Sequence, residues 1–212
     1  AGDAWGGVVK TGGIGQISYD DGDVGVYGQA EYNKYTGKNV KDNTSIEINT
    51  GGYYKAFENE NSDLQVGVNL NYTSYDNNQN YFTFGHGGYF SPQRFVSVAI
   101  PIKYEGRSST GKFSYSVEAA PGYQNYRQDD ADYFPNNPDL QADLAADVAA
   151  GTAEAAVYEG NTSSGVGFAG EAKAEYKLND TTSLGGSVRF NNFGDFNETA
   201  ARVYLTHIFG DW

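Results

Sequence analysis

Apolar and polar residues alternate with a period of two along most of the sequence, and this period constrains the fold more than any other feature. The pattern is clearest over residues 64 to 75, where the apolar members are Leu64, Val66, Val68, Leu70 and Tyr72. Successive side chains of a strand point to opposite faces, whereas a helix repeats every 3.6 residues. The pattern therefore predicts a strand with one apolar and one polar face.

Nine segments of this kind are recognisable, and short runs of turn-forming residues separate many of them. Residues 95 to 104 are expected to form one unbroken strand, while the register of the first segment is unclear because it is rich in glycine. One helix is expected inside a long loop, since Asn137 is a good N-cap and Pro138 suits the first helical position. The nine strands are expected at residues 7–19, 24–35, 44–58, 64–75, 95–104, 111–126, 165–178, 184–191 and 202–209.

The connections between these segments alternate in length. Four are short, at residues 20–23, 58–63, 105–110 and 178–182, whereas the others are longer, at 36–43, 76–93, 127–161 and, less so, 194–200. Transmembrane β-barrels of the bacterial outer membrane have short periplasmic turns and long outer loops, with apolar and polar residues alternating along each strand. The sequence therefore predicts an all-β fold, an antiparallel barrel of this type, with its C-terminus in the periplasm and one face against lipid.

Composition limits the alternatives. The formal net charge is −13, which disfavours a nucleic-acid surface. The mean hydropathy of −0.59 is that of a soluble protein, but a barrel that is apolar only at alternate residues gives the same average. Charged residues on the polar strand faces need water rather than a dry core. A soluble antiparallel sheet with one solvated face has the same alternation and remains the alternative.

The strand count raises a question about completeness. Bacterial single-chain barrels nearly always have an even number of strands, and with a periplasmic C-terminus the first of nine strands would begin outside the cell. We therefore expect one barrel domain over residues 1–212 that lacks preceding strands at its N-terminal side. The alternatives are a small closed barrel and two short strands within residues 4–19.

Four stretches carry a resemblance to a known family: TGKNVKDN, LQVGVNLNYTSYDNNQNYFTFG, GHGGYFSPQRFVSVAIPIKYEG and NPDLQADLAA. In this order they resemble the C-terminal porin domain of bacterial cellulose synthase operon protein C, over most of the chain. The resemblance implies a sixteen-stranded outer-membrane barrel, preceded by a periplasmic tetratricopeptide-repeat region, through which nascent glucan from an upstream synthase complex crosses the membrane. The 34-residue helical repeats themselves are absent from this sequence.

On this interpretation the function is a passive outer-membrane conduit for an exopolysaccharide, most simply cellulose, with no cofactor, no metal and no bond made or broken. A sliding polymer needs many weak, similar contacts rather than one tight site. The polar strand faces supply them, and the expected polysaccharide path consists of Gln29, Glu31, Asn33, Glu47, Asn49, Lys55, Gln65, Asn69, Asn71, Lys103, Ser114, Ser116, Glu118, Glu171, Lys173, Glu175, Arg189, Asn191, Arg202 and Tyr204.

The loop over residues 81 to 93 is the expected exit. Its glycines and proline could be ordinary turn formers, or they could shape a backbone that presents aromatic rings to sugar CH faces. The residues concerned are Phe84, Gly85, His86, Gly87, Gly88, Tyr89, Phe90 and Pro92.

Other functions have weaker support. His86 and His207 are the two histidines and are far apart in sequence, so a metal or base role is not expected for either. Glu118, Glu171 and Glu175 could in principle form a glycosidase carboxylate pair, which requires two carboxyls about 5 Å apart in a retaining enzyme. A closed structural or adhesin-type barrel and a small barrel enzyme acting on lipid A or glycan remain the other function classes.

Overall fold

The computed structural model describes residues 4–194 and 197–209, and these fold into one large antiparallel sheet with a helical loop at one end. Nine strand positions lie side by side in sequence order, as expected, with β5 and β6 sharing one position, and every neighbouring pair is antiparallel. The strands are β1 (Gly6–Asp20), β2 (Val24–Lys38), β3 (Val40–Glu58), β4 (Ser62–Tyr75), β5 (Arg94–Ala99), β6 (Ile102–Arg107), β7 (Phe113–Gln128), β10 (Asn161–Lys177), β11 (Thr182–Asn191) and β12 (Glu198–His207).

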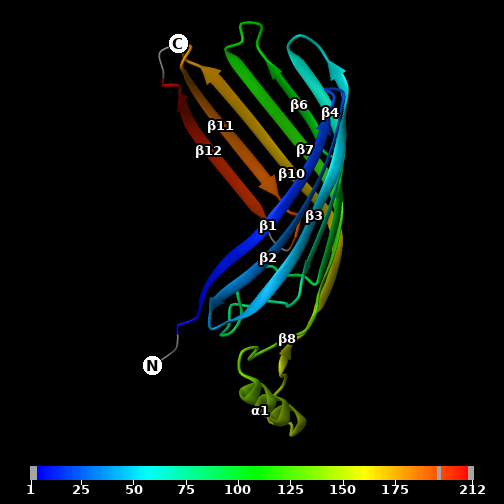
Figure 1. Ribbon diagram of the computed structural model, residues 1–212, viewed down its shortest axis with the longest axis vertical. Coiled ribbons are helices and arrows are strands. Elements are labelled where there is room, and N and C mark those ends of the chain that lie inside the picture. The colour runs from blue at the N-terminus through cyan, green and yellow to red at the C-terminus, as the bar shows by residue number, and fades with distance from the viewer. Residues whose placement is uncertain (1–3, 195–196, 210–212) are drawn as a thin grey trace.

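The sheet is strongly curled, and β1 and β12 are its two edges (Figure 1). Within the described residues, β1 pairs only with β2 and β12 only with β11. β1 is one continuous strand, with a register shift between Gly6 and Val9. The alternative of two short strands within residues 4–19 is therefore wrong.

The stave predicted over residues 95–104 is interrupted where the sequence suggested one unbroken strand. Pro101 has no N–H to give to the ladder, and Pro121 of β7 lies beside the same point. The strand therefore divides into β5 and β6. Backbone bonds from Gly67 N to Pro101 O (2.8 Å) and from Ile100 N to Pro121 O (2.9 Å) bridge the break, and the register is the same on both sides of it.

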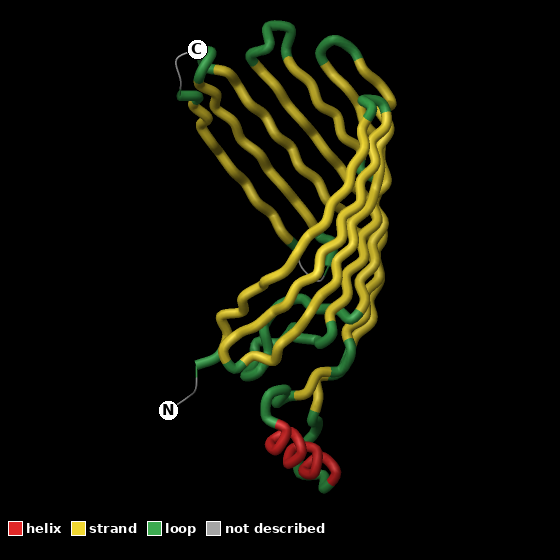
Figure 2. Tube along the Cα trace, in the orientation of Figure 1, coloured by secondary structure: helices red, strands yellow, loops and turns green. Residues whose placement is uncertain are grey.

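Short and long connections are segregated to opposite ends of the sheet (Figure 2). The turns after β1, β3, β6 and β10 lie at the end where β12 finishes, and residues 76–93 and 129–160 lie at the other. Residues 36–43, expected as a long loop, were predicted wrongly. β2 and β3 extend through them and meet in a tight turn at Asn39, whose φ of 52° is tolerated by asparagine.

The loop between β7 and β10 has structure of its own. Helix α1 (Pro138–Ala149) begins after Asn137, whose side chain accepts a hydrogen bond from Leu140 N, as predicted. Strands β8 (Ala131–Asp132) and β9 (Val157–Tyr158), which were not predicted, form a two-residue ladder at the base of this loop. Leu140 is 46% exposed and α1 buries none of its residues, so the helix stands outside the sheet. No helix in the described part of the chain has the length and apolarity needed to cross a membrane.

Candidate functional site

The strand registers place the polar residues of the predicted path on one face of the sheet. Residues that pair directly across an antiparallel ladder share a face, and one lateral row runs from Gln29 through Asn49 and Asn71 to Ser97. A second row runs from Gln65 through Lys103, Glu118 and Glu171 to Arg189. Most other members lie at even spacing from these on the same strands. Arg202 and Tyr204 lie on β12 at even spacing from Ala200, which pairs with Arg189. The whole predicted set therefore faces one way.

This face is the concave one. A cavity of about 570 Å³ is lined jointly by residues of β2, β3, β4, β5, β7, β10 and β11, which is possible only on the inner side of the curl. Asn49, Asn69, Asn71, Glu118 and Asn191 are among the lining residues. The interior therefore offers amide and carboxylate groups from most of the staves to one common space.

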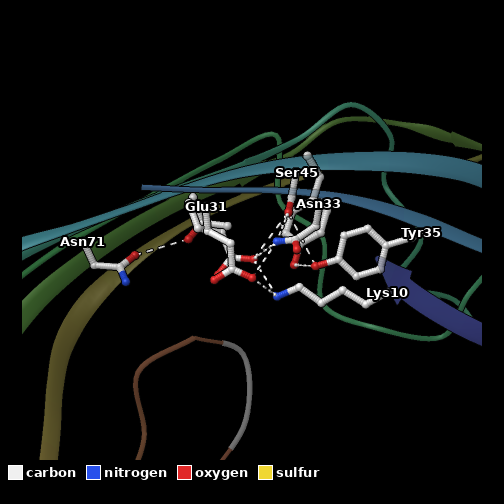
Figure 3. A network of polar contacts seen from close by, with 9 residues as sticks. Lys10, Glu31, Asn33, Tyr35, Ser45 and Asn71 are labelled. Atoms are coloured by element: carbon white, nitrogen blue, oxygen red, sulfur yellow. Dashed lines mark hydrogen bonds and ion pairs between the residues drawn. The ribbon is translucent and has the colours of Figure 1, made fainter. Parts of the chain in front are cut away.

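A polar network on the inner face of β1, β2 and β3 is centred on Lys10 (Figure 3). The Lys10 ammonium lies 2.8 Å from Glu31 Oε1 and 3.3 Å from Glu47 Oε1. The Asn33 amide nitrogen donates to the same two carboxylates at 2.9 and 3.3 Å. Glu31 and Glu47 are direct cross-strand neighbours, so Lys10 offsets a repulsion that two facing carboxylates would otherwise create.

Several other inner charges also occur as pairs of opposite sign. Lys173 Nζ lies 3.0 Å from Glu171 Oε2, and Arg189 Nη2 lies 2.6 Å from Glu198 Oε1. These side chains are partly exposed, and such pairs contribute only about 0–1 kcal/mol each. Their main effect is that positive and negative charges lie close together on the inner face of the sheet.

The loop over residues 76–93 folds back over the inner face at the long-loop end. The Tyr89 ring stacks on the Tyr35 ring with a centroid separation of 5.1 Å. Phe90 makes edge-on contacts with Phe95 at 6.2 Å and with Tyr126 at 5.1 Å. Burial raises the pKa of Tyr89 to about 12. The loop is therefore held on the strand wall by aromatic contacts.

His86 joins the two long loops. Its side chain is fully buried, its Nε2 lies 2.8 Å from Asp132 O, and its ring packs edge-on against Tyr81 and Tyr158. Tyr81 and Tyr158 stack on each other with centroids 3.9 Å apart. Burial lowers the pKa of His86 because the charged imidazolium is disfavoured there. This position explains His86 as a packing residue that ties β8 to the loop over residues 76–93.

The other predicted exit residues occupy different environments. Phe84 is 39% exposed, whereas Pro92 is fully buried. Gly85 and Gly88 have φ values of 92° and 68°, which a residue with a Cβ adopts with strain, so both are required by the backbone path. Gly87 lies against the Tyr89 ring. Whether Phe84, Tyr89 and Phe90 touch a polymer stays a prediction.

Sequence reasoning did not single out several aromatic residues of the inner face. Tyr27, Tyr75, Phe95 and Phe193 all line the 570 Å³ cavity. Tyr27 has the same parity as Gln29 and Glu31 on β2, and this parity could have identified it as inward-facing. Phe193 lies in the connection between β11 and β12, where no strand parity indicates a direction.

The histidine and carboxylate residues considered for metal binding or hydrolysis do not form a common site among the described residues. His207 lies on β12, its Nδ1 2.8 Å from Thr182 Oγ1, far from His86 in the fold. Glu118 and Glu171 are direct cross-strand neighbours, but Glu171 is paired with Lys173. In the described ranges no group of three or more histidine, cysteine, aspartate or glutamate residues is arranged to hold a metal ion.

Comparison with known proteins gives consistent matches. The family described as "Cellulose synthase operon protein C C-terminus" matches residues 1–210. "Cellulose synthase operon protein C" of Pseudomonas fluorescens (strain SBW25) is 39% identical over 211 residues, covering 100% of this chain and 16% of that protein. The protein of the same name from Xanthomonas axonopodis pv. citri is 35% identical, covering 98% of this chain and 14% of that protein. In Salmonella typhimurium the corresponding protein is 28% identical, with 100% and 17% covered. The chain thus spans about one sixth of the length of these relatives.

Proposed function

The chain belongs to the cellulose synthase operon protein C C-terminal family, and on this premise we propose that it forms part of the wall of an outer-membrane conduit for cellulose. The observation that carries the proposal is the two-sidedness of a curled sheet. Its convex face is apolar and uncovered, and its concave face is polar and surrounds a cavity. The transport is passive, with the driving force supplied by synthesis of the polymer upstream.

The convex face supports a lipid environment. Its apolar side chains are exposed on nearly every strand, among them Val26, Ile46, Val68, Val98, Val117, Val188 and Leu205. Soluble monomeric proteins rarely expose contiguous apolar patches larger than a few hundred Å². A face of this kind requires lipid or another apolar layer, and the family favours lipid with the C-terminus on the periplasmic side.

The concave face supports a hydroxyl-rich cargo. Amide, hydroxyl and carboxylate groups alternate around it, and a polymer with hydroxyls along its length can exchange hydrogen bonds with them at each step. A β-glucan in transit is such a polymer. Because the contacts are numerous and alike, the wall suits sliding better than retention.

The free edges support additional strands. β1 and β12 each leave one row of backbone N–H and C=O groups without a sheet partner among the described residues, and in lipid such groups cost several kcal/mol each. We therefore expect residues 1–212 to be one part of a barrel domain whose further strands lie N-terminal to them in the full protein. The periplasmic tetratricopeptide-repeat region and the synthase complex are the other expected partners.

Single-channel recording on the full-length protein in a planar bilayer tests the conduit. Open-pore conductance together with outer-membrane fractionation is the expected result. A full-length protein that is recovered as a monomer in plain buffer without detergent would refute the membrane barrel.

A closed structural barrel is the second candidate, and the inward packing of residues 76–93 is the observation that favours it. The same recordings separate the two functions. A conduit conducts ions with this loop in place, whereas a closed barrel conducts only after residues 81–93 are deleted.

A further inference from the structure

Two tyrosines of the concave face lie flat across a glycine of the neighbouring strand. Asp20, Gly25 and Tyr53 stand side by side on β1, β2 and β3. A Cβ on Gly25 would overlap the Tyr53 ring, so the ring occupies the space above that glycine. The Tyr53 hydroxyl continues across β2 and donates to Asp20 Oδ2 at 2.5 Å.

The same arrangement occurs near the other edge of the sheet. Glu175, Gly185 and Tyr204 stand side by side on β10, β11 and β12. A Cβ on Gly185 would overlap the Tyr204 ring, and the Tyr204 hydroxyl lies 3.3 Å from Glu175 Oε2. Each ring therefore crosses one strand and is fixed at its far end by a carboxylate on the next. We call these two sets the tyrosine rungs.

The geometry of a rung determines what the ring presents. One ring face lies on glycine backbone, so the opposite face is turned to the interior, and both tyrosines keep part of their surface exposed. Both rungs are in the half of the sheet that contains the short turns. Tyr204 and Glu175 line a cavity of about 510 Å³ there, and Tyr53 lines one of about 140 Å³.

We infer that the tyrosine rungs are pyranose-stacking platforms that contact the glucan at the short-turn end of the conduit. An aromatic face accepts the apolar CH face of a sugar ring by the offset contact that aromatic pairs use. The adjoining carboxylate oxygen accepts a hydrogen bond from a sugar hydroxyl, as ionised carboxylates do at up to four lone-pair sites. The inference rests on the proposed function and assigns it a substrate-contacting pair that the exit loop does not contain.

Aromatic–glycine pairs also stabilise sheets with no ligand present, so the test must separate binding from folding. The readout is block of the ion current through the full-length protein in a planar bilayer by cellohexaose added on the short-turn side. Y53L and Y204L remove the ring, and Y53F and Y204F keep it while removing the hydroxyl. Heat-modifiable gel mobility of each variant reports that the barrel has formed.

Each leucine variant should raise the half-blocking concentration of cellohexaose about two- to tenfold, and the double variant more. Each phenylalanine variant should stay within about twofold of wild type, because the ring still lies on its glycine. A second route is G25V, which displaces the ring without removing it and should weaken block as Y53L does. Maltohexaose lacks the flat β-linked ribbon, so its half-blocking concentration should be the same in all of these variants and in wild type.

Three results would overturn the inference while the conduit stands. In the first, cellohexaose does not block the wild-type conductance, and in the second, it blocks the leucine variants at the same concentration as wild type. Phenylalanine variants as weak as the leucine variants would also overturn it, because the hydroxyl rather than the ring face would then matter. Absence of any wild-type conductance counts against the conduit itself and removes the inference with it.

Discussion

Truncation of Phe90 to alanine should release the loop over residues 76–93 from the strand wall. Phe90 contributes two edge-on aromatic contacts, to Phe95 and Tyr126. Such contacts are worth about 0.5–1.5 kcal/mol each, so the pair holds the docked loop by about 2 kcal/mol. Since 1.36 kcal/mol is a factor of ten, the ratio of docked to undocked loop should fall about 30-fold in F90A.

Hydrogen exchange by mass spectrometry on the full-length protein measures this ratio. The amides of Gly88 and Tyr89 donate to Gln79 O at 2.9 and 3.2 Å, so their protection depends on the docked loop and should fall about 30-fold in F90A. F84A is the matched control, because Phe84 makes none of these ring contacts and is 39% exposed. Equal protection in F90A and wild type would show that the aromatic contacts do not hold the loop.

Three further predictions concern groups outside this contact. His86 is buried as the neutral form with a lowered pKa. Its contribution to loop stability is therefore complete above the pKa of histidine in the unfolded chain, about 6.5, and is lost as the pH falls below it. Protease cleavage of the loops should accelerate at pH 5, and cleavage of H86N should depend less on pH. N137A removes the cap bond to Leu140 N and should destabilise α1 by about 1 kcal/mol, seen as faster amide exchange at residues 139–141 with unchanged exchange in β10. K10M removes an inner cation and should make the pore more cation-selective in a salt-gradient reversal potential, whereas K34M, which changes an exposed pair with Asp42 on the convex face, should not.

The face to which each strand side chain points was predictable, because odd and even positions along a strand alternate between the two faces. Once Leu70 is assigned outward, Asn69 and Asn71 must face inward, and the register to Asn49 then carries the assignment to the next strand. Strand ends were less predictable. Residues 36–43 contain Gly37 and Asn39, both turn formers, but only tertiary pairing determines that a single tight turn at Asn39 is enough.

The loops were predictable only in composition. Residues 81–93 are rich in glycine and aromatics, but whether such a loop stands in solvent or packs on the wall depends on contacts with Tyr35 and Tyr126, which are distant in sequence. The tyrosine rungs escaped prediction for a related reason. Tyr53 and Gly25 are ordinary residues on a polar face until the register sets them side by side.

In the proposed conduit, the packing of the loop over residues 76–93 would affect the kinetics of polymer passage. His86 contacts, Tyr89 stacking and Phe90 contacts hold it at three separate points. A polymer that passes this loop while the loop stays docked does not have to displace it for each sugar unit. The rate of advance would then have the shallow temperature dependence of diffusion in a narrow channel, rather than the steep dependence that repeated local unfolding imposes.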